Sequence, residues 1–282
     1  MNSSRSTAVK VWLANMKARV LVFVAVFAML ALGMIGVLTP AAVSAASSCP
    51  SGGTPPPGST VDGGLDVDGT CILVSVTVNG GITVEATGHL SFQDGTVNGG
   101  IVVLPCGELD VNATTLGAGV PTGTSATING GIVLNGAAPL TICPVGSFAD
   151  ADIFTALIDG GILVTGNFPG SAPRICNNEI RGHATLNDVF APFGFSLGDE
   201  ASTGCPGNTI HGAVHVSNSS GTAIFRLEVE GNIVGGSVLL SGSTLELQGN
   251  TINGSLRCSN GTVLLPGEPG DPANTVHGAN TC

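Results

Sequence analysis

Thr96-Val97-Asn98-Gly99-Gly100-Ile101-Val102-Val103 is the stretch that decides the fold, because the rest of the chain repeats it. A polar–apolar–polar triplet is followed by two glycines and an aliphatic run. Versions of it recur along the chain, and the residue before the first glycine marks each one, at positions 62, 79, 98, 129, 159, 181, 211, 234, 253 and 277. Self-similarity of this kind sets the architecture and is considered before any local pattern.

The spacing of the markers predicts a solenoid. Neighbouring markers lie 17 to 31 residues apart, and the shorter steps fit one coil of a parallel β-helix, which needs roughly 18–25 residues. Three steps near 30 indicate the same coil with an inserted side loop. We assign these loops to residues 112–126, 135–156 and 187–206, of which the last is the largest. The expected fold is an all-β parallel β-helix of about ten coils.

Alternation within the repeat predicts which side chains are buried. Val97 lies between polar neighbours, as expected for a strand with one buried face. Stacked coils then form an interior ladder of Val61, Val78, Val97, Ile128, Ile158, Ile180, Ile210, Ile252 and Val276. An exterior ladder beside it contains Thr60, Thr77, Thr96, Thr127, Thr209, Thr251 and Thr275. The paired glycines are expected to permit a bend with positive φ.

The first 45 residues are typical of an export signal. Residues 1–19 carry four cationic and no acidic side chains, residues 20–38 are apolar, and small residues follow at 41–46. We expect a signal helix in residues 1–45 with cleavage after Ala45. The alternative is an uncleaved anchor, since 19 apolar residues could span a bilayer. Residues 46–59, rich in Ser, Pro and Gly, are expected to be a linker before a solenoid domain over 60–282.

Removal of this segment leaves a strongly acidic chain. Four arginines and no lysine face 19 acidic residues, which gives a formal net charge of −15. Such a chain repels phosphate backbones, so nucleic acid is excluded as a partner. A membrane partner is expected only if the N-terminal segment stays uncleaved. The expected location is the medium or the cell surface.

All eight cysteines follow the signal, and their even number in an exported chain predicts disulfides. Cys176 and Cys205 precede their markers by five and six residues, which predicts a bond between adjacent coils. Cys258 and Cys282 each follow their markers by five residues and are expected to pair in the same way. Elimination leaves two further pairs, Cys106–Cys143 and Cys49–Cys71. A metal site is disfavoured because no C-x-x-C is present and the histidines, His211, His215 and His277 among them, are scattered.

The sequence contains few candidates for chemistry. Carboxylates are paired two residues apart at Asp150/Asp152 and Glu228/Glu230, and a glycosidase needs two such groups across a cleft. Solvated acids are the commoner interpretation of this pattern. The aromatic run that contains Phe190, Phe193 and Phe195 is either a ligand platform or a means of packing a loop onto the coils, and we favour packing. No catalytic, cofactor or metal residue is assigned.

The repeat resembles right-handed parallel β-helix proteins of the pectin-lyase-like kind. V-x-G-x-V-x-V coils, paired cysteines and an export signal are most similar to secreted bacterial solenoids of uncharacterised function, and the resemblance covers residues 60–282. It implies a right-handed coil. It does not carry an activity, since fold does not imply function. Polygalacturonase-like motifs such as N-T-D and G-H-G are absent, and the four arginines are not grouped with acids in any recognisable way, which disfavours uronate chemistry.

We therefore expect an exported, non-catalytic solenoid with a structural or adhesive role. The expected partner is a cell-wall or extracellular polysaccharide, or another surface protein. The first alternative is a carbohydrate-active enzyme on the same fold, which requires three or more converging acids or an arginine beside acids. The second alternative is an ice- or surface-binding protein, which requires a flat threonine face.

Overall fold

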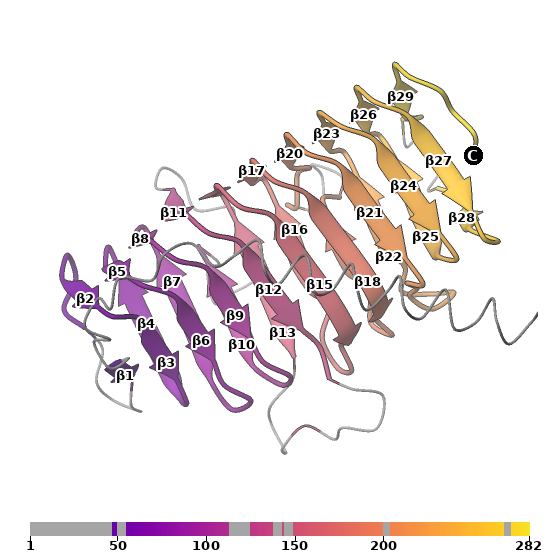
Figure 1. Cartoon of the computed structure of the whole chain (residues 1–282). Coiled ribbons are helices and arrows are strands. Elements are labelled where there is room, and N and C mark those ends of the chain that lie inside the picture. Colours follow the sequence, from indigo (N-terminus) through magenta and orange to yellow (C-terminus); the bar gives the residue numbers. More distant parts are fainter. Residues whose placement is uncertain are drawn as a thin grey trace, which may run out of the picture. The chain divides into compact units, whose positions relative to one another are not determined.

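The computed structural model describes residues 47–49, 55–112, 125–137, 143, 149–199, 204–267 and 272–282. All regular structure in these residues is β, arranged in three parallel sheets that run along the stack of coils (Figure 1). Each coil passes through the first, second and third sheet in turn. The parallel β-solenoid expected from the repeat is confirmed, whereas the signal helix falls outside the described residues.

The first sheet carries the polar–apolar–polar triplets. Its ten strands are β2 (Thr60–Asp62), β5 (Thr77–Asn79), β8 (Thr96–Val97), β11 (Ala126–Ile128), β14 (Ala156–Ile158), β17 (Glu179–Ile180), β20 (Thr209–Ile210), β23 (Ile233–Val234), β26 (Thr251–Ile252) and β29 (Thr275–Val276).

The second sheet follows the glycines. Its ten strands are β1 (Ser47–Cys49), β3 (Leu65–Val67), β6 (Ile82–Val84), β9 (Ile101–Val103), β12 (Ile132–Asn135), β15 (Ile162–Asn167), β18 (Ala184–Phe190), β21 (Val214–Ser217), β24 (Val238–Ser241) and β27 (Leu256–Ser259). Because β1 pairs with β3, the solenoid begins inside the segment that we assigned to a linker. The disulfide from Cys49 to Cys71 ties this additional strand to the first full coil.

The third sheet closes each coil. Its nine strands are β4 (Thr70–Val74), β7 (His89–Gln93), β10 (Glu108–Val111), β13 (Asp150–Phe154), β16 (Arg174–Cys176), β19 (Phe195–Leu197), β22 (Leu227–Glu230), β25 (Thr244–Gln248) and β28 (Val263–Leu265). Two expected side loops are therefore shorter than predicted. Residues 150–154 form β13, and β18 and β19 extend into 187–206 at residues 187–190 and 195–197, because these segments continue the coil register with their neighbours.

The interior ladder forms as expected. Val78, Val97 and Ile128 are fully buried and pair in register. Val61 and Val276, in the terminal coils, are only partly buried. Val234 also belongs to this ladder, opposite Ile210 and Ile252. The marker at position 234 was therefore wrong by one residue, since Gly235 occupies the place that His211 and Asn253 hold in their coils.

The paired glycines serve close approach rather than positive φ in most coils. Only Gly63 and Gly64 of the first coil have positive φ. A Cβ on Gly99 would lie 2.7 Å from the backbone carbonyl of Gly80, so any larger residue would push the coils apart. The left-handed residues lie at other corners, for example Asp94 and Asn177, because Asp and Asn tolerate this conformation. The expected role of the glycine pair was therefore wrong in most coils.

A buried asparagine ladder, which the sequence analysis missed, lines the corner between the third and first sheets. Asn178, Asn208, Asn232 and Asn250 are at most 2% exposed. The backbone N–H of Asn208 donates to Oδ1 of Asn232 at 2.9 Å, and Nδ2 of Asn208 donates to the carbonyl of Ile175 at 2.7 Å. The same pattern repeats from coil to coil, so these amides satisfy backbone groups that the corner would leave unpaired.

Four disulfides join the coils, in the pairs expected from the sequence. They are Cys49–Cys71, Cys106–Cys143, Cys176–Cys205 and Cys258–Cys282, with Cα–Cα distances of 4.9–5.8 Å. Stacked coils about 4.8 Å apart bring Cα atoms into this range. The bonds fit an oxidising, extracellular environment.

Candidate functional site

The three phenylalanines suggested as a platform do not form one surface. Phe195 is buried and packs against Phe168, with ring centroids 6.2 Å apart. Phe190 and Phe193 stay exposed, and the ring of Phe193 lies 5.9 Å from that of Phe225. Phe195 is therefore part of the core and is not accessible to a ligand.

The exterior of the first sheet carries the threonine ladder, but the ladder is interrupted. Thr127 is followed in register by Leu157 and Glu179, and Ile233 interrupts it again between Thr209 and Thr251. A second exterior column, of marker residues, runs beside it. In this column Asn98 donates to Asn79 at 2.8 Å, Asn129 donates to Asn98 at 2.7 Å, and Arg181 donates to Asp159 at 2.6 Å. His211 and His277 belong to this column, whereas His215 lies on the second sheet.

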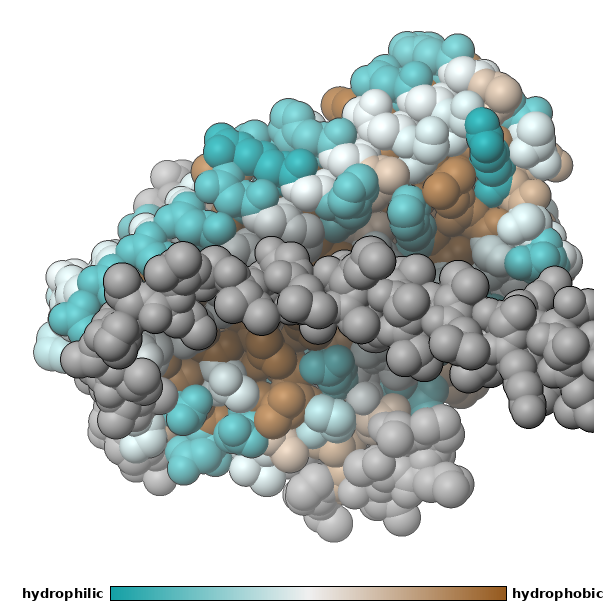
Figure 2. Space-filling view, viewed as in Figure 1, coloured by the Kyte–Doolittle hydropathy of each residue, from teal (hydrophilic) through white to brown (hydrophobic). Residues whose placement is uncertain are grey.

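The exterior of the second sheet has an aliphatic centre, which we call the aliphatic column. Val102, Val133 and Leu163 pair in register, and Leu239 continues the column after Thr185 and His215. Val102, Leu163 and Leu239 are each 36–37% exposed. Figure 2 looks at this face and shows hydrophobic residues in separate areas of it, with hydrophilic residues along the edge where the first sheet lies. Exposed aliphatic side chains arranged in one line indicate an interaction surface.

A column of uncharged polar side chains runs parallel to the aliphatic column, two residues further along each strand. It contains Asn135, Thr165, Asn187, Ser217, Ser241 and Ser259. Some of these groups bond to each other, as when the Ser217 hydroxyl donates to Asn187 at 2.7 Å. Hydroxyl and amide groups both donate and accept, so this column can bind a polyhydroxylated ligand without any charge.

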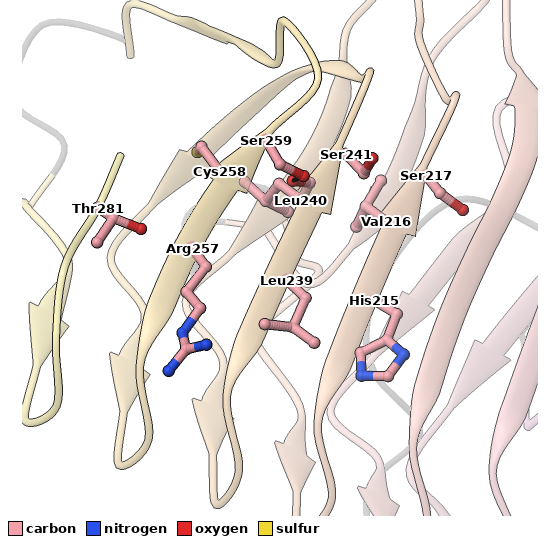
Figure 3. Close-up of a pocket in the computed structure, with 10 residues that line it drawn as sticks. All are labelled: His215, Val216, Ser217, Leu239, Leu240, Ser241, Arg257, Cys258, Ser259 and Thr281. Atoms are coloured by element: carbon pink, nitrogen blue, oxygen red, sulfur yellow. Dashed lines mark hydrogen bonds between the residues drawn. The ribbon is translucent and has the colours of Figure 1, made fainter.

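The two columns meet a hollow near the C-terminal end of the second sheet. It has a volume of about 460 Å³ and is lined mainly by β21, β24 and β27. Figure 3 shows His215, Leu239 and Arg257 side by side along one column, with Ser217, Ser241 and Ser259 along the other. The hollow therefore adds a cation and an imidazole to columns that contain no carboxylate between Val102 and Leu239.

On the third sheet, charged side chains that are far apart in the sequence lie next to one another. One exterior column reads Asp110, Asp152, Arg174, Ser196, Glu228 and Glu246 in register. Arg174 donates to both carboxylate oxygens of Asp152, at 3.0 and 2.6 Å, and its guanidinium lies 5.3 Å from the ring centroid of Phe154. The interpretation that no arginine is grouped with acids was wrong, because partners 20–22 residues apart become neighbours once the coils stack.

Asp150 and Glu228 are carboxyls whose surroundings disfavour the charged form. Burial, with the nearby charge of Asp152, raises the pKa of Asp150 to about 6. Burial raises the pKa of Glu228 to about 7, with the charges of Asp199 and Glu246 adding to it, although Ser196 donates to Glu228 at 2.7 Å. Both carboxyls therefore titrate in the range where general acids and bases work.

Glu228 and Glu230 were considered together as a carboxylate pair, but the structure pairs Glu228 more closely with Glu246. These two face each other in register on β22 and β25. Glu246 is almost fully buried and forms an ion pair with Arg226, while its Oε1 atom has no hydrogen-bond partner among the residues described. Glu230 is 6% exposed. Aligning the third strand of every coil would have revealed this pairing in the sequence.

His89, Glu108 and Asp110 form the other cluster that sequence reasoning missed. Nε2 of His89 lies 2.9 Å from Oδ2 of Asp110 and 3.8 Å from Oε1 of Glu108. The hydrogen bond to Asp110 is the largest influence on the imidazole and raises the pKa of His89. Burial raises the pKa of Glu108. The cluster joins two strands of the third sheet, β7 and β10. The glycine markers did not reveal it, because they align only the first strand of each coil.

No helix in the described part of the chain is long and apolar enough to cross a membrane. Comparison of the chain with known protein families, with curated proteins and with solved structures finds no match.

Proposed function

We propose that the protein is an exported, disulfide-stapled solenoid that adheres to a neutral extracellular polysaccharide through the outer face of the second sheet. The observation that carries the proposal is the aliphatic column of Val102, Val133, Leu163 and Leu239 beside a column of uncharged hydroxyl and amide groups. The proposal also includes export by the N-terminal segment and membership of the pectin-lyase-like group of bacterial solenoids.

The chemistry of the two columns matches that of a sugar chain. A pyranose ring presents C–H groups on its faces and hydroxyls at its rim. The aliphatic column offers apolar contact to the faces, and side chains such as Asn187 and Ser217 offer donors and acceptors to the rim. The aliphatic column is continuous over three successive coils, from Val102 to Leu163, and the polar column continues from Asn135 to Ser259. A regular polymer could therefore bind at several coils in succession, and the binding energy would accumulate along the chain.

Charge selects a neutral polymer over an acidic one. The chain carries a formal net charge of −15 without its N-terminal 45 residues, which repels polyanions. The columns themselves contain no carboxylate between Val102 and Leu239. An acidic polysaccharide is therefore expected to bind weakly, at most near the Arg257 end of the face.

Co-sedimentation tests this proposal. The mature chain is incubated with cellulose, chitin, an insoluble β-glucan and, for comparison, an insoluble cross-linked polygalacturonate. We expect retention on at least one neutral polymer. Leu163→Asp should weaken it by at least about tenfold, because a charge in the aliphatic column would be desolvated on binding.

Ile233→Asp is the matched control, since Ile233 is an exposed aliphatic residue, 51% accessible, on the first sheet instead. The proposal fails if the wild-type chain stays in the supernatant with all neutral polymers, or if the two variants lose binding equally.

The third sheet supports a second candidate function, a carbohydrate-active enzyme. Glu228, whose pKa burial raises to about 7, lies in register with Glu246, which forms an ion pair with Arg226. A carboxyl that titrates near neutral pH beside a second carboxyl can serve as a general acid or base. Release of new reducing ends or unsaturated products from a polysaccharide, abolished by Glu228→Gln and not by Glu85→Gln, would establish it. Intact polysaccharide after prolonged incubation would exclude it for the polymers tested.

A further inference from the structure

We propose that His89, Glu108 and Asp110 bind a divalent transition-metal ion, Zn²⁺ being the best match, on the outer face of the third sheet. The site is independent of the polysaccharide face, which lies on the second sheet. It joins two consecutive coils, because His89 begins β7 and the two carboxylates lie on β10.

The donor atoms already converge. One ligand atom from each side chain lies within 4.8 Å of the others, and Nε2 of His89 is 2.9 Å from Asp110 and 3.8 Å from Glu108. An ion about 2.0–2.2 Å from each donor needs donor atoms roughly 3.0–3.5 Å apart. A shift of a few tenths of an ångström at Glu108, which is partly exposed, therefore completes the geometry.

The parallel register holds the ligands in place. Glu108 lies directly opposite His89, and Asp110 lies opposite Ser91, so all the side chains project from the same face. The neighbours Leu90 and Leu109 are fully buried and point into the core. Ligands fixed on strands lose little conformational freedom on binding, which favours affinity.

Ser91 lies opposite Asp110 on the neighbouring strand, projects from the same face and is only 4% exposed. A metal site with three protein ligands leaves a fourth position for water, which the Glu108 side of the cluster, partly open to solvent, can supply.

The carboxylates around the site are not balanced by arginine side chains, and a bound cation would reduce this excess of negative charge. Arg174 is committed to Asp152 through two hydrogen bonds. No arginine forms an ion pair with Glu108, Asp110 or Asp150 in the described part of the chain. Mutual repulsion and burial act on these three carboxyls, and a divalent ion would neutralise two of their charges.

The donor set selects the kind of ion. One imidazole with two carboxylates suits zinc and its transition-metal neighbours. Calcium and magnesium prefer oxygen donors throughout, and calcium takes six to eight of them. We therefore expect Zn²⁺ to bind more tightly than Ca²⁺.

Isothermal titration calorimetry on the chelator-treated, untagged mature chain tests the site, with ZnCl₂ and CaCl₂ as the probes. The wild-type chain should bind one Zn²⁺ with a dissociation constant at least about tenfold lower than that for Ca²⁺. His89→Gln and Asp110→Asn should each weaken Zn²⁺ binding by at least about tenfold.

His211→Gln is the matched control, because His211 is also a partly exposed histidine beside a carboxylate, 3.2 Å from Glu179, but lies next to Arg181. It should leave Zn²⁺ binding unchanged. Circular dichroism establishes that each variant is folded. The proposal is overturned if folded wild-type protein takes up no stoichiometric Zn²⁺, or if His89→Gln binds as tightly as His211→Gln.

Discussion

Replacing Asp150 by asparagine should stabilise the protein at alkaline pH. Asp150 lies on β13, opposite Glu108 and two residues from Asp152, and burial is the main reason that its pKa rises to about 6. Asparagine has the same shape and keeps an oxygen for the backbone N–H of Ala151, which Asp150 accepts at 2.9 Å. The substitution therefore removes the charge and little else.

The direction of the pKa shift of Asp150 determines how its contribution to stability changes with pH. A carboxyl whose pKa rises on folding favours the folded state only while it is protonated. The stability that Asp150 contributes is thus fully present below about pH 4 and is lost as the pH rises through about 6. A change from 3.8 to about 6 sets an upper limit of about 3 kcal/mol. Because Asp150 is partly exposed, screening reduces the expected gain to about 1–2 kcal/mol.

Thermal unfolding of the disulfide-bonded, chelator-treated chain measures this gain. The melting temperature of Asp150→Asn should exceed that of the wild type by about 2–8 °C at pH 8, and the difference should disappear near pH 4. Asp68→Asn, which changes an exposed acid, is the control. A variant that is less stable than the wild type at pH 8, or a gain that is the same at both pH values, would refute the reasoning.

Three further predictions concern the scaffold. Asn208→Ala should lower the free energy of unfolding, measured by chemical denaturation, by about 2–3 kcal/mol, because it breaks buried hydrogen bonds to Ile175 and Asn232. Asn98→Ala in the exposed ladder should lower it by less than about 0.5 kcal/mol, and equal losses would contradict the role of the buried ladder. Replacing Cys176 and Cys205 together by serine should cost about 3–4 kcal/mol, since the bond closes a loop with a sequence separation of 29; an unchanged denaturation midpoint would count against this. Gly99→Ala should reduce the yield of folded protein far more than Gly81→Ala. A Cβ at Gly99 would lie 2.7 Å from the backbone of Gly80, whereas the nearest atom to a Cβ at Gly81 is 3.4 Å away. Similar yields would show that the coils can separate to accommodate a methyl group.

The repeat was sufficient to predict the stacking of the first strands and two of the disulfides, Cys176–Cys205 and Cys258–Cys282, whereas the other two pairs followed by elimination. Val97 and Thr96 recur at a constant offset from the glycines, and a period of two assigns one to the core and the other to the surface. Cysteines at equal offsets from their markers, as in Cys258 and Cys282, or at nearly equal offsets, as in Cys176 and Cys205, are then expected to stack. These inferences need only the position of each residue within its coil.

The charged faces could not be predicted in this way, because their register depends on the third strand of each coil. Loops of different length separate that strand from the glycines, as between β9 and β10 and between β12 and β13. The alignment of Glu228 with Glu246, or of His89 with Glu108, therefore does not follow from the glycine markers and requires a separate alignment of the third strands. The buried asparagines were missed for a different reason. Asn178, Asn208 and Asn250 lie at a constant three residues before their markers, but just outside the stretch that was compared between coils.

Hydroxyl-radical footprinting of the protein bound to a neutral polysaccharide tests the central claim most directly. Radicals oxidise exposed aliphatic side chains, so mass spectrometry can compare Val102, Leu163 and Leu239 with Ile233 on the first sheet. The proposed function predicts that the bound polymer protects the three residues of the aliphatic column and leaves oxidation of Ile233 unchanged. Protection confined to the first or third sheet, with the aliphatic column still oxidised at its free rate, would contradict it.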